Sequence, residues 1–187
     1  MMINTNFLFL CFLFMTITTV NQNAVAQMIF NDDFDDIKKW DFISDNVMGG
    51  VSSGKISIKS VNRNKVIALK GKVSTENNGG FIQARRNLRS FSLKEAKYIK
   101  IIARGNNEKY YIHLRTSRMI FPWQYYQIGF NVDNGFKEFI LPLSQFKTSG
   151  LFLAKTPKAK NITSIAIVAF GKDHNAELDV SSISIYK

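Results

Sequence analysis

The feature that most limits the fold of this chain is the alternation of apolar and polar residues at a period of two. Tyr110, Ile112 and Leu114 fall on one face of a single segment, and more polar neighbours fall on the other. Residues 125–130 and 182–186 repeat the pattern. Such alternation is typical of β-strands that bury one face. No long segment has the period of an amphipathic helix, so the chain is predicted to be all-β.

Turn signals divide the chain into short strands. Asp133-Asn134-Gly135 lies between two apolar stretches and predicts a β-hairpin, and Ser92–Ala96 and Leu143–Phe146 are expected to form single helical turns. The uninterrupted apolar run 165–170 predicts a strand covered on both faces. Short strands at this density indicate an antiparallel sandwich or barrel, and periodicity alone does not choose between them. The other strands are expected at residues 55–60, 65–70, 80–86, 98–104, 135–141 and 162–170.

Residues 1–26 are predicted to form a secretory signal peptide. The apolar run Phe7–Val20 precedes the small-x-small sequence Ala24-Val25-Ala26. A membrane anchor is the alternative, but the run is shorter than the ~20 residues that span a bilayer. Cleavage would export residues 27–187 as one domain, periplasmic or secreted, with no stable membrane anchor. It would also remove Cys11, the single cysteine, so the hydrophobic core must stabilise the domain.

The sequence has a net charge of +11, from 25 basic and 14 acidic side chains. A positive chain can bind nucleic acid or another anionic surface. Here Lys and Arg are scattered along predicted strands and turns, without the dense basic run that marks a nucleic-acid patch. We therefore interpret the charge as a Lys-rich solvated surface and predict no nucleic-acid partner.

Two blocks combine a Gly-Gly pair with carboxylate and amide side chains. Glycine pairs permit positive φ angles or close backbone approach, and Asn or Asp beside them can fix the shape of a loop. The blocks could line a polar cleft together with Arg85, or their side chains could simply hold the two loops in place, as a carboxylate and an arginine fork do well. The residues of this candidate surface are Asp45, Asn46, Met48, Gly49, Gly50 and Ser52 in the first block and Glu76, Asn77, Asn78, Gly79 and Gly80 in the second.

Aromatic residues form a second candidate site. Trp123, Tyr125 and Tyr126 lie close to Arg115 in the sequence. Exposed aromatic rings serve as stacking platforms for sugars and also anchor protein interfaces, while the alternative is that they fill the core. Trp40 is expected to pack against the edge of the sandwich.

Catalytic and metal-binding interpretations have less support. Asp45 and Glu76 could act as a glycosidase pair, but the sequence does not fix their separation. His113 is expected to face solvent or the polar face of a sheet, and it is far from His174, the other histidine. The acidic run Asp32–Asp36 could offer oxygen ligands to Ca²⁺ or be a solvated segment. No catalytic residue, cofactor or metal is predicted.

The two glycine blocks, together with segments such as Leu114-Arg115-Thr116 and Leu141–Phe146, resemble the signature of the complex I intermediate-associated protein family. The resemblance extends from about Phe34 to Ile185. It implies a galactose-binding-like jelly roll without catalytic activity that binds a protein partner and assists the assembly of a larger complex. This chain would be an exported bacterial relative. The alternative is an exported carbohydrate-binding module with a glycan as partner. In either case we expect the two Gly-Gly turns to lie side by side at one end of the sandwich.

Overall fold

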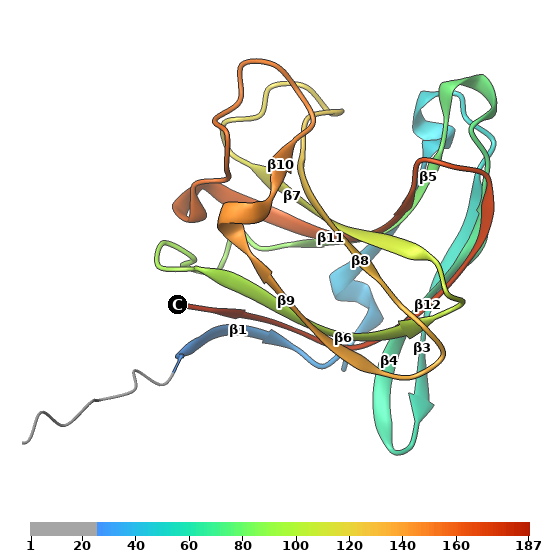
Figure 1. Cartoon of the computed structure of the whole chain (residues 1–187), viewed down its shortest axis with the longest axis horizontal. Coiled ribbons are helices and arrows are strands. Elements are labelled where there is room, and N and C mark those ends of the chain that lie inside the picture. The colour runs from blue at the N-terminus through green and yellow to red at the C-terminus, as the bar shows by residue number, and fades with distance from the viewer. Residues whose placement is uncertain (1–25) are drawn as a thin grey trace, which may run out of the picture.

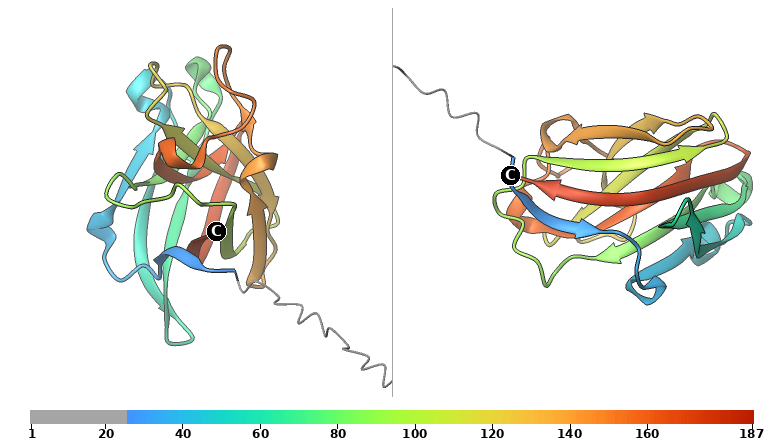
Figure 2. Two further views of the ribbon diagram at one scale, coloured as in Figure 1. Left: turned by 90° about the vertical axis from the view of Figure 1, so that its left-hand side faces the viewer. Right: turned by 90° about the horizontal axis from the view of Figure 1, so that it is seen from below.

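The computed structural model describes residues 26–187, which form two six-stranded antiparallel sheets packed face to face (Figures 1 and 2). The predicted signal segment lies almost entirely outside the described residues. Sheet A has the order β3-β4-β12-β6-β9, and β1 pairs with the second half of the long strand β12. Sheet B has the order β10-β8-β7-β11-β5-β2. The strands of sheet A are β1 (Met28–Asp32), β3 (Ser53–Val61), β4 (Asn64–Val73), β6 (Tyr98–Gly105), β9 (Lys137–Pro142) and β12 (His174–Tyr186). Those of sheet B are β2 (Trp40–Ser44), β5 (Phe81–Asn87), β7 (Lys109–Thr116), β8 (Tyr126–Asn131), β10 (Lys147–Thr148) and β11 (Ile162–Phe170).

The core lies between the inner faces of the two sheets, as the alternation predicts. Tyr110, Ile112 and Leu114 of β7 are fully buried there. In β12 the period of two is interrupted, because Leu178 and Val180 face the core and the next core residue is Ile183. The register of β12 against β6 shifts between Val180 and Ser182, so an irregularity in the ladder keeps both halves of the strand facing inward.

Helical structure within the described residues is limited to short 3₁₀ turns. The predicted turn after Pro142 is present as η4, whereas residues 92–96 form only a single turn, in which the Ala96 N–H donates to the Leu93 carbonyl at 2.9 Å. None of these elements has the length and hydropathy needed to cross a bilayer. The turns are η1 (Ile37–Lys39), η2 (Asp45–Met48), η3 (Glu76–Asn78), η4 (Leu143–Gln145) and η5 (Ala159–Asn161).

The predicted hairpin at Asp133-Asn134-Gly135 is wrong. The segment reverses the chain, but β8 belongs to sheet B and β9 to sheet A, so the connection crosses between the layers. The β6–β7 connection crosses beside it, and the Gly105 N–H donates to the Asp133 carbonyl at 2.7 Å. Turn chemistry specifies that the chain reverses, whereas burial of the flanking strands decides which neighbour each strand pairs with.

Buried polar groups attach the N-terminal segment to the sandwich. Asp32 is 2% exposed, accepts hydrogen bonds from the Phe34 N–H and the Trp40 indole, and forms an ion pair with Arg86. Trp40 packs at this edge as predicted, with 4% of its surface exposed. Asp32 therefore has a structural role, because its oxygens fix the Phe34 backbone, the Trp40 indole and Arg86 at this edge.

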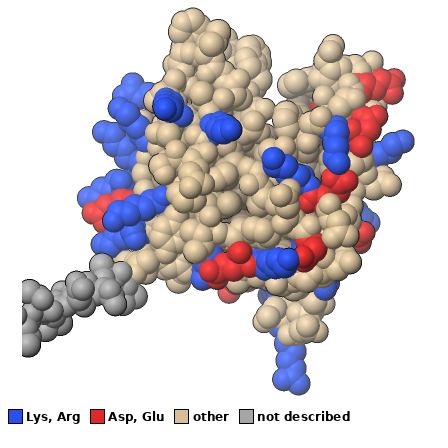
Figure 3. Space-filling view, in the orientation of Figure 1, with Lys and Arg blue, Asp and Glu red and all other residues tan. Residues whose placement is uncertain are grey.

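The outer face of sheet B is flanked by two raised lobes (Figure 1). We call residues 45–52 and 74–80 the glycine-loop lobe, and residues 117–125 and 149–161 the aromatic-loop lobe. The space-filling view shows a hollow between them (Figure 3). Sheet A forms the opposite surface of the molecule, seen from below in Figure 2.

Candidate functional site

The glycine-loop lobe is built around the carboxylate of Asp45, which is fully buried. Its oxygens accept hydrogen bonds from the Ser52 N–H at 2.9 Å, the Ser52 hydroxyl at 2.5 Å, the Gly80 N–H at 2.5 Å and the Phe81 N–H at 3.2 Å. Burial alone would raise the pKa of Asp45, but these donors outweigh it and hold the pKa below its usual value. One side chain therefore joins both glycine blocks, which lie side by side as expected.

Two of the glycines in this lobe are required by close packing. A Cβ on Gly50 would lie 2.4 Å from Cγ of Asp45, and a Cβ on Gly79 would lie 2.4 Å from its Oδ2. Gly49 has a φ of +88° and nothing within 4 Å of such a Cβ, so there the backbone conformation is what favours glycine. Gly50 and Gly79 thus leave room for the buried carboxylate of Asp45.

The aromatic-loop lobe is held by Arg115 of β7. The guanidinium donates to the carbonyl oxygens of Phe121 and Gln124, each at 3.1 Å, and also to that of Pro122. The buried Gln124 side chain accepts from the Ile120 and Phe121 N–H groups at 3.0 and 3.1 Å. Trp123 stacks on Phe121 with ring centroids 4.9 Å apart, and 59% of its surface is exposed. The loop therefore presents an indole ring from a fixed backbone.

The floor of the hollow is the outer face of sheet B, which is rich in aromatic rings. His113 of β7 stacks on Tyr125, with centroids 4.0 Å apart and an interplanar angle of 7°. The ring of Phe170 of β11 meets both edge-on, at 5.8 and 6.2 Å. His113 does lie on the polar face as expected, but these rings cover it to 8% exposure. Burial lowers the pKa of His113 to about 3, so its imidazole is neutral at physiological pH.

Polar groups from β5 and β11 complete the hollow, which we call the sheet B cleft. Gln83 and Arg85 come from β5, and Ser164 comes from β11. The cleft is lined by Phe81, Gln83, Arg85, His113, Arg115, Pro122, Trp123, Gln124, Tyr125, Ser164, Ala166 and Phe170. Aromatic surface with a few polar groups is the usual lining of a small-molecule or sugar site.

Residues 29–180 match the family model of complex I intermediate-associated protein 30 (CIA30). The chain belongs to the CIA30 family. No match was found among curated proteins.

Solved structures similar to this CIA30 domain share its fold. The family 11 carbohydrate-binding module from Clostridium thermocellum, in complex with a β-1,3-1,4-mixed-linked tetrasaccharide, has a TM-score of 0.68 and 16% identity, covering 87% of this chain and 96% of that one. A family 30 module of a cellulosomal cellulase from the same organism has a TM-score of 0.53 and 12% identity, covering 86% and 96%. An exo-β-agarase has a TM-score of 0.54 and 10% identity, covering 86% of this chain and 24% of that one. The fold is a jelly-roll β-sandwich, which confirms the predicted fold class.

The structure brings only part of the predicted site together in this CIA30 domain. Arg85, Arg115 and Trp123 line the cleft. Tyr126 does not, because its side chain is 3% exposed and belongs to the core, and its neighbour Tyr125 takes the outward position. Sequence reasoning placed Tyr125 in the aromatic group but missed His113, Phe170 and Gln83 as lining residues. Their strands β5, β7 and β11 could have indicated them, because residues that alternate with the buried ones point to the outer face of the sheet.

The glycine-loop residues have two different roles. Asp45, Ser52, Gly50, Gly79 and Gly80 form the buried clamp. The other predicted residues lie on the exposed rim, where Asn46 accepts a hydrogen bond from the Ser44 hydroxyl at 2.6 Å. Among the described residues no ion pair joins Glu76 to Arg85. The rim residues are Asn46, Met48, Gly49, Glu76, Asn77 and Asn78.

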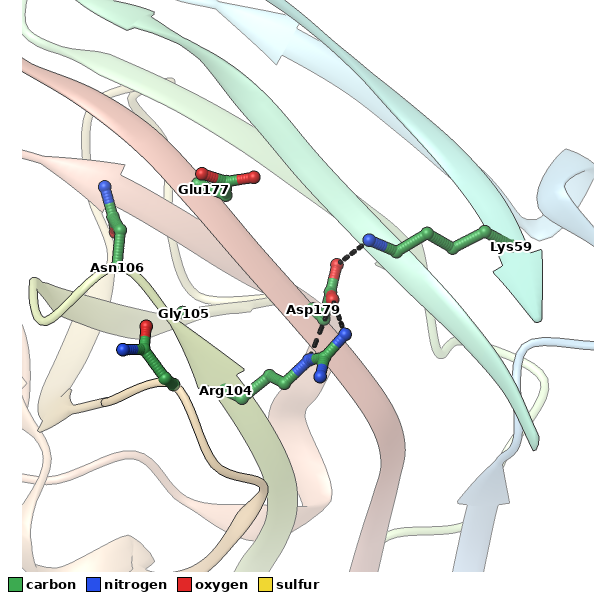
Figure 4. Close-up of a pocket in the computed structure, with 7 residues that line it drawn as sticks. Lys59, Arg104, Gly105, Asn106, Glu177 and Asp179 are labelled. Atoms are coloured by element: carbon green, nitrogen blue, oxygen red, sulfur yellow. Dashed lines mark hydrogen bonds and ion pairs between the residues drawn. The ribbon is translucent and has the colours of Figure 1, made fainter. Parts of the chain in front are cut away.

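A second hollow, of about 280 Å³, lies on the outer face of sheet A (Figure 4). Asp179 of β12 sits at its centre, 2.8 Å from Nζ of Lys59 and 3.1 Å from both Nε and Nη2 of Arg104. Glu177 in turn pairs with Lys70. The charged side chains named here pair with one another within the protein, so we interpret this hollow as a cross-strand ion-pair network. The sheet B cleft is the better candidate site.

Proposed function

We propose that this CIA30 domain is a non-catalytic, exported binding domain whose sheet B cleft holds a segment of a glycan chain. The observation that carries the proposal is the pair of stacked aromatic platforms, Tyr125 on His113 and Trp123 on Phe121, beside polar Gln83 and Arg85. The C–H faces of a sugar pack on aromatic rings, and its hydroxyls bond to side chains that fix its orientation.

The relatives support this proposal by analogy of fold. The family 11 module is described in complex with a tetrasaccharide, and it covers almost the same length as this chain. Function is not inherited with a fold, so the residues of the cleft carry the proposal and the likeness in fold adds to it. An exported location, as the N-terminal sequence predicts, would bring the domain to extracellular polysaccharide.

The geometry argues against glycosidase chemistry at the carboxylates named from the sequence. Asp45 is fully buried, and its oxygens are occupied by four donors, so it cannot reach a sugar. The residues that line the cleft include no carboxylate. Glycoside hydrolysis by the usual route needs a pair of them across the bond that breaks.

The test is binding of the purified protein to a glycan array, followed by calorimetry with each ligand found. Replacing Trp123 or Tyr125 with Ala should lower affinity about tenfold or more, because each change removes a stacking surface. Tyr98→Ala is the matched control, since Tyr98 stacks on Tyr186 on the sheet A side, at 5.0 Å. The proposal fails if no glycan binds, or if the control loses as much affinity as the cleft variants.

A protein partner, with a role in assembling a complex, is the second candidate function. It is favoured by large apolar side chains exposed at the tips of both lobes. Val47 and Met48 are 72% and 56% exposed in the glycine-loop lobe, and Leu151 and Phe152 are 81% and 101% exposed in the aromatic-loop lobe. Apolar tips of this kind often mark protein-binding surfaces.

Photo-crosslinking separates the second candidate from the first. A photoreactive residue at position 48 or 152 should capture a discrete protein in the native cell envelope if the tips bind a partner. The same residue at Arg63, on the distant β3–β4 turn, is the control (Figure 1). Equal labelling from all three positions would argue against a partner at the tips.

A further inference from the structure

The sheet B cleft contains two guanidinium groups and no carboxylate. Arg85 reaches it from β5 and Arg115 from β7, two strands that flank β11 on either side. Both side chains are partly buried. Among the described residues neither takes part in an ion pair, whereas Arg86 and Arg104 pair with Asp32 and Asp179. This concentration of positive charge is therefore a local property of the cleft, in addition to the basic surface of the whole domain.

The two arginines differ in what holds them. The donors of Arg115 are engaged by loop carbonyls, which carry no net charge, so its positive charge stays uncompensated. Burial lowers the pKa of Arg115, and the positive charge of Arg85 lowers it further, which indicates that the two groups act on each other. No hydrogen bond within the described residues engages the guanidinium of Arg85. Its five N–H donors are thus available to a ligand.

One carboxylate lies near Arg85 without neutralising it. Asp41 of β2 is its cross-strand partner, so the two side chains are on the same face of sheet B. No ion pair joins them among the described residues, and Asp41 is exposed on the edge strand. An anionic ligand would therefore meet an arginine whose charge is not already matched.

We propose that the cleft selects an anionic glycan, in which a carboxylate or sulfate group of the sugar chain binds the Arg85 guanidinium while a neighbouring sugar ring packs on Tyr125 or Trp123. This inference rests on the proposed glycan-binding function and names the class of ligand. A planar guanidinium matches a carboxylate or sulfate with two parallel hydrogen bonds, and Arg115 adds attraction at short range. A neutral glycan would leave both charges unmatched.

The experiment compares glycans that differ only in charge. Oligogalacturonate is measured against its methyl ester, and a sulfated galactan oligosaccharide against neutral agaro-oligosaccharide, each by calorimetry with the purified protein. We expect at least one acidic member to bind tenfold or more tightly than its neutral counterpart, since charge-assisted hydrogen bonds are about twice as strong as neutral ones. Which pair responds distinguishes carboxylate from sulfate recognition. Affinity for the acidic member should fall as salt rises, and affinity for the neutral member should not.

Variants separate the cleft from the charge of the whole domain. Arg85→Gln should remove most of the difference in affinity between the acidic and the neutral glycan, and the attraction of Arg115 remains. Arg85→Lys should retain more of the difference, because it keeps the charge without the fork. Arg63→Gln removes the same charge at the distant β3–β4 turn and should leave binding unchanged. Equal losses in R85Q and R63Q would overturn the proposal, as would equal affinity for charged and neutral glycans, and both results would leave glycan binding itself intact. If no glycan of either kind binds, the proposed function fails as well.

Discussion

Replacing Asp45 with Asn tests whether one buried carboxylate holds the glycine-loop lobe together. The two side chains have the same shape, so the variant changes charge and hydrogen bonding with little change in packing. Asn offers one acceptor oxygen in place of two and turns an NH₂ group toward the remaining donors. If the amide oxygen takes the place of Oδ2, it keeps the bonds from the Gly80 and Phe81 N–H groups and from the Ser52 hydroxyl, and the NH₂ group takes the place of Oδ1. The buried Ser52 N–H then has no acceptor.

The expected loss follows from this change in hydrogen bonding. A hydrogen bond to a charged group contributes about 1.5–3 kcal/mol, and a buried donor left without a partner costs about 1–3 kcal/mol. We therefore expect Asp45→Asn to lower the free energy of unfolding by about 3 kcal/mol at neutral pH. For a domain of this size that corresponds to a fall in Tm of roughly 6–12 °C. The control is Asp36→Asn, because Asp36 is a partly exposed carboxylate that accepts a single backbone hydrogen bond, from Lys38. That variant should lose less than about 1 kcal/mol.

The pH dependence of the difference gives an independent check. The pKa of Asp45 is lowered in the folded state, so its contribution to stability is present above the unfolded value of about 3.9. It is lost as the pH falls through that value toward the folded pKa. Urea unfolding of wild type and D45N should therefore differ most near neutrality, and the difference should shrink as the pH falls below about 3.9. If the two proteins are equally stable at neutral pH, or if the difference does not shrink as the pH falls below about 3.9, the clamp interpretation is wrong.

Three further sets of variants test other contacts of the protein. Gly50→Ala should destabilise the protein more than Gly49→Ala, because the new Cβ at position 50 would lie 2.4 Å from Cγ of Asp45. At position 49 there is open space, and only the φ of +88° disfavours alanine. Equal shifts of the two variants in thermal melts would contradict this. Between about pH 7.5 and pH 5 the free energy of unfolding of wild type should fall by about 2 kcal/mol, because an unfolded histidine gains a proton while the buried His113, with a pKa of about 3, does not. His113→Phe keeps a ring against Tyr125 and should abolish this fall. Parallel curves of stability against pH for the two proteins would refute the prediction. Asp41→Asn should raise calorimetric affinity for an acidic glycan about two- to threefold by removing the negative charge beside Arg85, and unchanged or weaker binding would count against the proposed ligand.

Several features of the fold could be predicted because they depend on local pattern. Alternation placed Tyr110, Ile112 and Leu114 on the buried face, and the continuous apolar run identified β11 as a strand covered on both sides. The pairing of strands could not be predicted in the same way. The Asp133-Asn134-Gly135 turn looks the same in sequence whether it closes a hairpin or crosses between sheets, and only the packing of β8 and β9 on opposite layers decides.

The candidate site was predictable only in part. The glycine blocks were identified by their composition, and their closeness in space was expected. Their division into a buried clamp and an exposed rim was not, because sequence does not reveal which carboxylate will collect four donors. Tyr126 and Tyr125 show the same limit. They are adjacent and chemically identical, but where the chain enters β8 one side chain points into the core and the other onto the cleft floor.

The sequence by itself determined the β-rich character of this protein, the positions of its turns and its CIA30 signature, because those depend on periods and residue types that are read along the chain. Only the tertiary structure decided that Arg85, His113, Trp123 and Phe170 meet at one cleft. They lie on different strands and loops, and their approach depends on the order of strands in sheet B and on the lobes beside it. The physical reason is that local pattern fixes which face of each strand is buried, while the burial of all strands together fixes which exposed faces become neighbours.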